Sequence, residues 1–298
     1  MIRIGTRGSA LALAQARLVA ERLDGEVELV PITTSGDRGA AGPDADKSRF
    51  VKEIEEALLA GEVDLAVHSA KDVPAELPDG LAIVAVPERA DPRDALCGAA
   101  ALGELAEGAA VGTSSLRRRA QLLALRPDLD LRELRGNVDT RLRRLAEGDF
   151  HAVVLAAAGL ERLGRGGEGL PLGELVPAPG QGCLALEARA DDGAVAAAAG
   201  ALTDEPALAC LTAERALVEA LDATCRTPIG AHAAPDGDAL RLTAFVGLPD
   251  GSHWIRDELE GSAAEPAPLG REVAERLLSA GAGEVLAEAE RLASTGGR

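Results

Sequence analysis

Arginine residues stand in short clusters beside glycines and hydroxyl side chains, although the chain as a whole is strongly acidic. The two densest clusters are residues 112–119 and residues 134–141. The formal net charge of -18 repels anions at long range, whereas guanidinium groups gathered at turns bind carboxylates and phosphates through paired hydrogen bonds. The sequence therefore predicts one localised site for a ligand rich in carboxylate or phosphate groups.

The first cluster follows an expected strand and opens an expected helix. In open α/β sheets the ligand crevice lies beyond the carboxyl ends of the strands, where helix N-termini offer unpaired N–H groups to anions. Thr113, Ser114 and Ser115 can cap the helix and donate to an oxyanion. Arg117 and Arg118 add charge from its first turn. The alternative interpretation is an ordinary N-cap followed by a solvated arginine face.

Two other segments repeat this arrangement. Arg135 and Arg141 bracket a second turn that opens a helix, so both side chains can point to one crevice; a salt-bridged helix start is the alternative. Arg7 and Ser9 follow the first expected strand in the same way. Three repetitions at equivalent strand ends favour a shared anion site.

The turn at residues 68–74 combines a base, an ammonium group and a carboxylate. The charge of Lys71 favours the ionised form of Asp72, which suits that carboxylate to stabilising a developing cation or to transferring protons. The alternative is a surface Lys–Asp pair with Pro74 ending the turn.

Cys225 lies in an expected loop beside Arg226. A neighbouring cation lowers the pKa of a thiol and raises the fraction of nucleophilic thiolate. The other cysteines fit the more common case of inert, buried thiols: Cys97, Cys183 and Cys210.

Alternating strands and helices must position these groups. In the first part we expect strands at 2–4, 27–32, 63–67 and 81–86 with helices at 10–23 and 50–60. A second stretch has strands at 109–112, 129–134 and 152–156 with helices at 115–125 and 138–147. From about residue 205 follow a helix at 207–221, strands at 240–247 and 253–259, and a helix at 269–280. The alternation predicts open, largely parallel sheets flanked by helices, then an α+β unit.

Composition excludes several functions. Hydrophobic residues make up 47% but aromatic residues only 1%, so the core must be aliphatic. The chain has neither the basic charge nor the stacking platforms of nucleic-acid-binding proteins. No apolar run approaches the roughly 20 residues of a membrane span, and no leader pattern is present, so we expect a cytoplasmic protein. Cysteine and histidine spacings predict neither disulfides nor a metal site.

Six motifs, in one order along nearly the whole chain, resemble the porphobilinogen deaminase family, also called hydroxymethylbilane synthase. They are residues 6–9, 50–53, 68–74, 112–118, 134–141 and 225–230. The resemblance implies an α/β fold in which two periplasmic-binding-protein-like α/β domains flank a cleft, with a C-terminal α+β domain. It also implies a monomeric transferase of tetrapyrrole and heme biosynthesis.

The implied reaction condenses four porphobilinogen molecules head to tail into hydroxymethylbilane and releases ammonia. The implied cofactor is a dipyrromethane attached by a thioether to Cys225. Each pyrrole carries an acetate and a propionate, which supplies the polyanion that the arginines require. By the same resemblance Asp72 is the catalytic residue, which assists departure of ammonia and stabilises the resulting cation.

Further site residues are implied by the same motifs. The cofactor-binding set is Cys225, Ser69, Lys71, Asp72, Thr113, Ser115, Arg117, Arg118 and Arg141. The substrate-binding set is Arg7, Ser9, Lys47, Phe50, Arg135, Arg162 and Gln181.

The chain departs from the family pattern at three places. Residues 46–49 replace a glycine-containing loop, although Lys47 and Phe50 remain. Ala70 replaces a methionine, and Ala223 with Thr224 replaces two glycines before Cys225. A positive φ at that last turn would strain alanine.

The motifs divide the chain into three expected domains. Residues 1–88 with 183–200 form domain 1, residues 92–177 form domain 2, and residues 205–298 form domain 3, which carries Cys225. A non-catalytic binding protein with the same two-lobed fold is the main alternative function. A phosphate-transferring enzyme is disfavoured because no G-x-x-x-x-G-K-[ST] loop is present.

Overall fold

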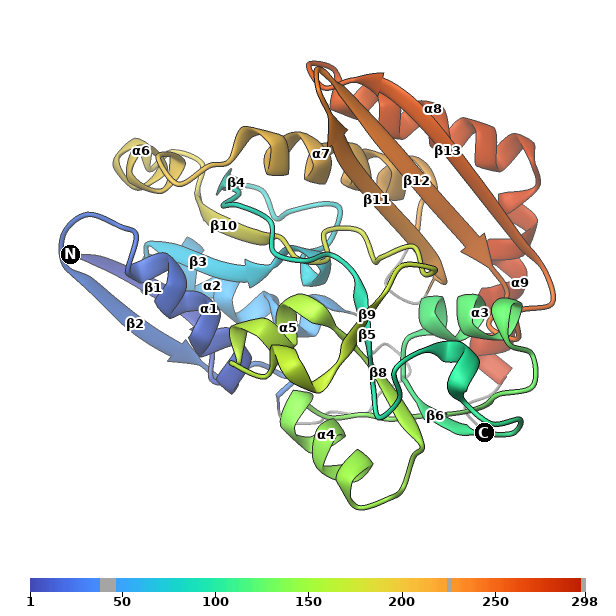
Figure 1. Ribbon diagram of the computed structural model, residues 1–298. Helices are drawn as coiled ribbons and strands as arrows, with labels where there is room; N and C mark the ends of the chain where they lie inside the picture. Colours follow the sequence, from blue (N-terminus) through green and yellow to red (C-terminus); the bar gives the residue numbers. More distant parts are fainter. Residues whose placement is uncertain (38–46, 224–226, 296–298) are drawn as a thin grey trace.

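The computed structural model describes residues 1–37, 47–223 and 227–295, which form three sheets with helices packed around them (Figure 1). The first two sheets have five strands each and the third has three. Among the described residues, the largest fully buried side chains are all leucine or isoleucine, as the scarcity of aromatic residues requires.

The first sheet lies at the N-terminal side of the molecule (Figure 1). Its strand order is β2 (Val27–Ile32), β1 (Ile2–Arg7), β3 (Leu65–Ser69), β10 (Leu184–Arg189) and β4 (Leu81–Ala85). Its helices are α1 (Ala10–Ala20), α2 (Lys52–Leu59) and α6 (Gly193–Gly200), with 3-10 turns η1 (Lys47–Phe50) and η2 (Ala70–Asp72). Ile4, Leu65 and Leu186 are fully buried in its core.

The second sheet follows along the chain. Its strand order is β7 (Asp130–Arg132), β6 (Ala110–Gly112), β8 (Ala152–Ala156), β5 (Asp94–Cys97) and β9 (Leu170–Leu172). Its helices are α3 (Leu116–Leu125), α4 (Val138–Ala146) and α5 (Ala157–Arg162), with 3-10 turns η3 (Leu102–Glu104) and η4 (Gly166–Glu168).

The prediction of largely parallel sheets is wrong for half of the strand pairs. In the first sheet β1 is parallel to β2 and β3, but β10 runs antiparallel between β3 and β4. In the second sheet β6 is parallel to β7 and β8, whereas β5 is antiparallel to β8 and β9. The reason is the chain path: β5 and β10 are the strands entered directly after the two crossings between the sheets, at residues 86–93 and 173–183.

The third sheet is the antiparallel meander β11 (Ile229–Asp236), β12 (Ala239–Gly247) and β13 (Trp254–Ser262). Helices α7 (Glu205–Ala220), α8 (Pro266–Ser279) and α9 (Ala282–Thr295) accompany it. The hairpin of β12 and β13 was predicted, but β11 and α9 were missed. Alanine, glycine and proline dominate β11, which gives it a weak strand pattern, and Gly281 with Gly283 interrupts the helical pattern at the start of α9.

The three sheets fix which segments meet, while the domain limits given above remain predictions. Within the described ranges no single helix is long and apolar enough to span a membrane; α6 and α7 pass that test only as a pair, and they are bent by 112°.

Candidate functional site

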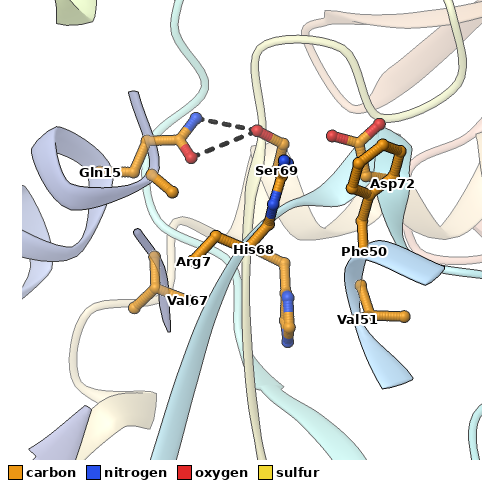
Figure 2. Close-up of a pocket in the computed structure, with 9 residues that line it drawn as sticks. Arg7, Gln15, Phe50, Val51, Val67, His68, Ser69 and Asp72 are labelled. Atoms are coloured by element: carbon orange, nitrogen blue, oxygen red, sulfur yellow. Dashed lines mark hydrogen bonds between the residues drawn. The ribbon is translucent and has the colours of Figure 1, made fainter. Parts of the chain in front are cut away.

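A pocket lies at the carboxyl edge of the parallel strands of the first sheet (Figure 2). Strands β1 and β3 are parallel neighbours that end at Arg7 and Ser69, so both residues reach the same edge. Four residues of the predicted site line the pocket: Arg7, Phe50, Ser69 and Asp72. The other lining residues are Ala12, Gln15, Val51, Val67 and His68.

Ser69 is held by a residue that the sequence analysis missed. The Gln15 Nε2 atom donates to the Ser69 Oγ atom at 2.8 Å (Figure 2). Gln15 belongs to the buried face of α1, together with Ala12, Ala16 and Val19. A polar residue at an apolar position of an amphipathic helix is the signal that would have identified it.

Arg7 is fixed from two sides. Its guanidinium carbon lies 4.3 Å from the centroid of the Phe50 ring, within cation–π distance. Its Nε atom donates to the Asp37 Oδ1 atom at 3.2 Å. Although burial opposes the shift, hydrogen bonds from Arg7 and Thr34 lower the pKa of Asp37. The pocket therefore has a positioned guanidinium whose charge is partly balanced by an ionised carboxylate.

Asp72 ends the short turn η2 directly after β3. Figure 2 shows the Asp72 carboxylate and the Ser69 hydroxyl on the same side of the strand, while the His68 imidazole points to the opposite side. For His68 and Ser69 this follows from the alternation of side chains along β3. The His68 ring is buried, and its Nε2 atom lies 3.0 Å from the Glu187 Oε2 atom. The Asp72 carboxylate and the Ser69 hydroxyl thus share one side of the sheet edge, and the His68 ring points away from them, toward Glu187.

A second group of charged residues begins at Lys71, next to Asp72, and continues into the second sheet. Asp94 in β5 is fully buried and forms ion pairs with Arg117 and Arg118 of α3. Arg117 Nη1 lies 2.7 Å from Asp94 Oδ2, and Arg118 Nη2 lies 2.8 Å from Asp94 Oδ1. Burial opposes ionisation of Asp94, but the two arginines outweigh it and lower its pKa.

Gln181 connects this ion pair to the first sheet. Its Nε2 atom donates to Asp94 Oδ1 at 2.9 Å and to the Pro92 carbonyl at 2.7 Å. Its Oε1 atom accepts from Lys71 Nζ at 3.3 Å. Lys71 and Asp94, which belong to different sheets, are therefore joined through one buried amide.

Lys71, Arg117, Arg118 and Arg141 form what we call the cationic cluster. Burial and the nearby charge of Arg118 lower the pKa of Arg141 to about 10, and the Arg141 Nε atom donates to the Gly136 carbonyl at 2.8 Å. Among the described residues, the buried Nε atom of Arg117 has no hydrogen-bond partner. Four cations thus gather around two carboxylates, Asp72 and Asp94. The excess positive charge and the unpartnered donor fit an anionic ligand.

The remaining predicted residues of the second sheet have mainly local partners. Ser115 caps α3 by accepting from the Arg118 backbone N–H, and the buried Thr113 hydroxyl accepts from the Ser115 backbone N–H at 3.2 Å. Arg162, at the end of α5, donates to the Gly182 carbonyl at 2.6 Å. Arg135 is exposed and pairs with Glu133. The Arg135 guanidinium therefore has an exposed local partner and is not among the described residues that line the pocket.

Three predicted residues remain: Ser9, Lys47 and Cys225. Ser9 caps α1 by accepting from the Ala12 backbone N–H at 3.3 Å. Lys47 begins η1, but its side chain lies outside the described residues. Cys225 also lies outside them.

The loop that leads to Cys225 has a positive φ of 48° at Asp222, whereas Ala223 does not have a positive φ. Aspartate tolerates this conformation better than alanine, so the strain expected at Ala223 does not occur. Ala70, the other departure from the family pattern, is buried and packs against Val73 and Cys183.

The fold and the site define a class of protein: an α/β protein of two sheets, with an appended α+β unit and a concentrated site for an anionic ligand. Residues 2–197 match the family model described as "Porphobilinogen deaminase, dipyromethane cofactor binding domain". Residues 208–279 match the one described as "Porphobilinogen deaminase, C-terminal domain". The chain belongs to the porphobilinogen deaminase family.

Curated relatives agree along the whole length. The porphobilinogen deaminase of Thermus thermophilus is 50% identical over 300 residues, which cover 97% of this chain and 99% of that protein. The porphobilinogen deaminase of Brevibacillus brevis is 48% identical over 303 residues, covering 97% of each chain. The family that the six motifs resemble is therefore confirmed.

Solved structures show a weaker similarity. A periplasmic His/Glu/Gln/Arg/opine family-binding protein from Silicibacter pomeroyi is 17% identical, with a TM-score of 0.36, and the match covers 68% of this chain and 88% of that one. YhfZ from Shigella flexneri is 20% identical, with a TM-score of 0.38, and the match covers 73% and 95%. The predicted fold class, two α/β units and a C-terminal α+β unit, is confirmed by the sheets and helices described above.

Proposed function

We propose that this protein condenses four porphobilinogen molecules head to tail into hydroxymethylbilane, with release of one ammonia for each molecule added and uptake of one water, which releases the product from the cofactor and supplies its hydroxyl group. The observation that carries the proposal is the cationic cluster beside Asp72, the one carboxylate among the described residues that line the pocket, in a chain of this family. Porphobilinogen and its oligomers carry two carboxylates per pyrrole, which matches the excess positive charge of the site.

The residues also fit the dipyrromethane cofactor that the family model names. A buried Arg117 Nε without a partner among the described residues, and two like charges close together at Arg118 and Arg141, are suited to carboxylates of a bound group. We assign its binding to the cationic cluster with Ser69, Asp72, Thr113 and Ser115, and its thioether attachment to Cys225. When bound, this group supplies the nucleophilic pyrrole carbon to which the first substrate is joined.

Asp72 is assigned the catalytic role. In each addition the carbon–nitrogen bond of the aminomethyl group breaks and its electron pair leaves on ammonia. A carbon–carbon bond then forms, and one proton is lost from the attacked pyrrole carbon. The Asp72 carboxylate lies in the pocket beside Ser69, where it stabilises the cation that remains after ammonia leaves and accepts the proton.

The arginines and hydroxyl groups are assigned to positioning. The residues assigned to substrate carboxylates are Arg7, Ser9, Lys47, Arg135, Arg162 and Gln181. Phe50 belongs to the same set because its ring holds the Arg7 guanidinium. Fixing both reactants in one geometry can remove as much as about 7–11 kcal/mol from the barrier of a bimolecular step. We also propose that the protein acts as a cytoplasmic monomer without metal or nucleic acid.

Turnover of porphobilinogen tests the function. The purified protein is expected to release ammonia and form hydroxymethylbilane, whereas a binding protein without chemistry would bind porphobilinogen and release none. Asp72→Asn is expected to lose about 10²–10⁴-fold in kcat. The matched control is Asp79→Asn, an exposed acid after the same turn, which should keep full activity. Equal activity of Asp72→Asn would remove Asp72 from the catalytic role.

A further inference from the structure

A carboxylate outside the predicted site lies at the centre of the contacts between the first two sheets. Asp94 is the first residue of β5 and directly follows the crossing at residues 86–93. We propose that Asp94 is the positioning residue of this site: it fixes the Arg117 and Arg118 side chains and, through Gln181, orients Lys71. This inference rests on the proposed function, because it names the group that sets the geometry of the carboxylate-binding residues.

The hydrogen bonds of Asp94 show why it acts through other residues. Its carboxylate accepts five hydrogen bonds, two from Arg117, two from Arg118 and one from Gln181. Since its side chain is fully buried and its oxygens are occupied, no substrate atom needs to reach it. Arg117 also donates to the Val176 carbonyl, and Arg118 to the Val154 carbonyl. Both guanidinium planes are therefore held on two sides before any ligand binds, which reduces the conformational entropy lost on binding.

Gln181 transmits this order to Lys71. The Nε2 atom of Gln181 has two acceptors, Asp94 Oδ1 and the Pro92 carbonyl, which fixes the orientation of the amide. The opposite end of the amide, Oε1, must then face the Lys71 ammonium. If the carboxylate of Asp94 no longer accepts from Gln181, the Gln181 amide loses one of the two contacts that fix its orientation.

Electrostatics link Asp94 to Lys71 independently of the hydrogen bonds. The charged groups that face Lys71 are Asp72 on η2, Arg117 and Arg118 on α3, and Asp94 on β5. Burial, the largest effect, and the two arginines lower the pKa of Lys71, the two carboxylates raise it, and the net result is a pKa of about 8. Removing the Asp94 charge therefore moves the Lys71 pKa below about 8, into the range where the ammonium is partly lost at neutral pH.

The test uses Asp94→Asn and the charge-retaining Asp94→Glu. The chain has three lysines, Lys47, Lys52 and Lys71. The side-chain ammonium resonances of the folded protein, with its cofactor attached, can therefore be titrated individually by 15N NMR. Asp94→Asn is expected to lower the Lys71 pKa by about one unit, because one neighbouring opposite charge is lost. Asp94→Glu keeps that charge, so its Lys71 pKa should stay close to that of the unsubstituted protein. The exposed Lys52 is the internal reference.

Steady-state kinetics give the second readout. Gln181, which the proposed function assigns to the substrate carboxylates, loses its contact with Asp94, so KM for porphobilinogen is expected to rise by about tenfold while kcat stays within about threefold. The alkaline limb of the kcat/KM profile of Asp94→Asn moves to lower pH with the Lys71 pKa.

Asp64→Asn is the control, since Asp64 also pairs with an arginine, Arg3, but is not among the charged groups that face Lys71. It should lose stability without moving the Lys71 pKa. If Asp94→Asn does not fold, Gln181→Met removes the link to Lys71 and keeps both arginine pairs; a smaller decrease of the Lys71 pKa is then expected. An unchanged Lys71 pKa in the folded Asp94 or Gln181 variant would overturn the inference even if turnover is normal, whereas absence of turnover in the unsubstituted protein would overturn the proposed function alone.

Discussion

Glu214→Gln is expected to destabilise the protein strongly, because one carboxylate holds three segments together. Glu214 lies on α7 and is fully buried. Arg89 Nη1 donates to its Oε1 atom at 2.6 Å, and Arg89 Nη2 donates to its Oε2 atom at 3.2 Å. The backbone N–H groups of Gly180 and Ala233 donate to the same carboxylate at 2.6 and 2.8 Å. Both crossings between the sheets and the first strand of the third sheet thus meet at Glu214.

The magnitude follows from what the substitution leaves behind. Glutamine removes the charge that balances the buried Arg89 guanidinium, and its NH₂ group faces a donor. Breaking a buried ion pair by removing one partner costs about 3–5 kcal/mol. Burial raises the pKa of Glu214, but the charge and hydrogen bonds of Arg89 outweigh burial, so the pKa lies below its usual value. The stabilisation is therefore present at neutral pH and is lost as the pH falls below the usual range of a carboxyl group.

Scanning calorimetry measures the effect. At about 2 °C per kcal/mol for a chain of this size, Tm is expected to fall by about 6–10 °C. Glu219→Gln, an exposed acid one turn further along α7, is the matched control and should change Tm by less than about 1 °C. Equal Tm values for the two variants would refute the reasoning that a buried charge at Glu214 joins the three sheets.

Two further predictions concern a buried acid and the loop cysteine. Burial and the nearby Glu187 raise the pKa of Glu55 from 4.5 to about 7. The folded state therefore binds a proton between those values, and stability falls as pH rises through that window. One pKa unit corresponds to about 1.4 kcal/mol, so in thermal unfolding at pH 8 Glu55→Gln should be more stable than the unsubstituted protein by at most about 3 kcal/mol. Near pH 4 the two proteins should be equally stable. The exposed Glu56→Gln variant is the control and should show no such pH dependence. Cys225→Ala should fold with an unchanged circular dichroism spectrum but should not turn over porphobilinogen.

Local patterns predicted most helices and strands near the site. The strand at 152–156 corresponds to β8, and the helix at 138–147 corresponds to α4. The helix cap at Ser115 was also predicted correctly. These features depend on residues a few positions apart, so their signals are contained in short windows of sequence.

Long-range pairing explains what the sequence did not show. Asp94 meets Arg117 across 23 residues and Gln181 across 87 residues. An acid in a strand that is otherwise apolar and fully buried was the available signal, but its partners depend on how the two sheets pack. The antiparallel insertion of β10 was missed for the same reason. The hydrophobic pattern of a strand does not show whether the strand runs parallel or antiparallel to its neighbours. The motif resemblance identified Lys71 and Gln181 without showing that one amide joins them to Asp94.

Intact-protein mass spectrometry tests the central claim most directly. We expect the freshly purified, folded protein to exceed the mass of its sequence by two porphobilinogen units less two molecules of ammonia, since each unit joins with loss of one ammonia. We expect Cys225→Ala to have the mass of its sequence alone. A protein that turns over porphobilinogen at the sequence mass, or a Cys225→Ala variant that retains the added mass, would contradict the account.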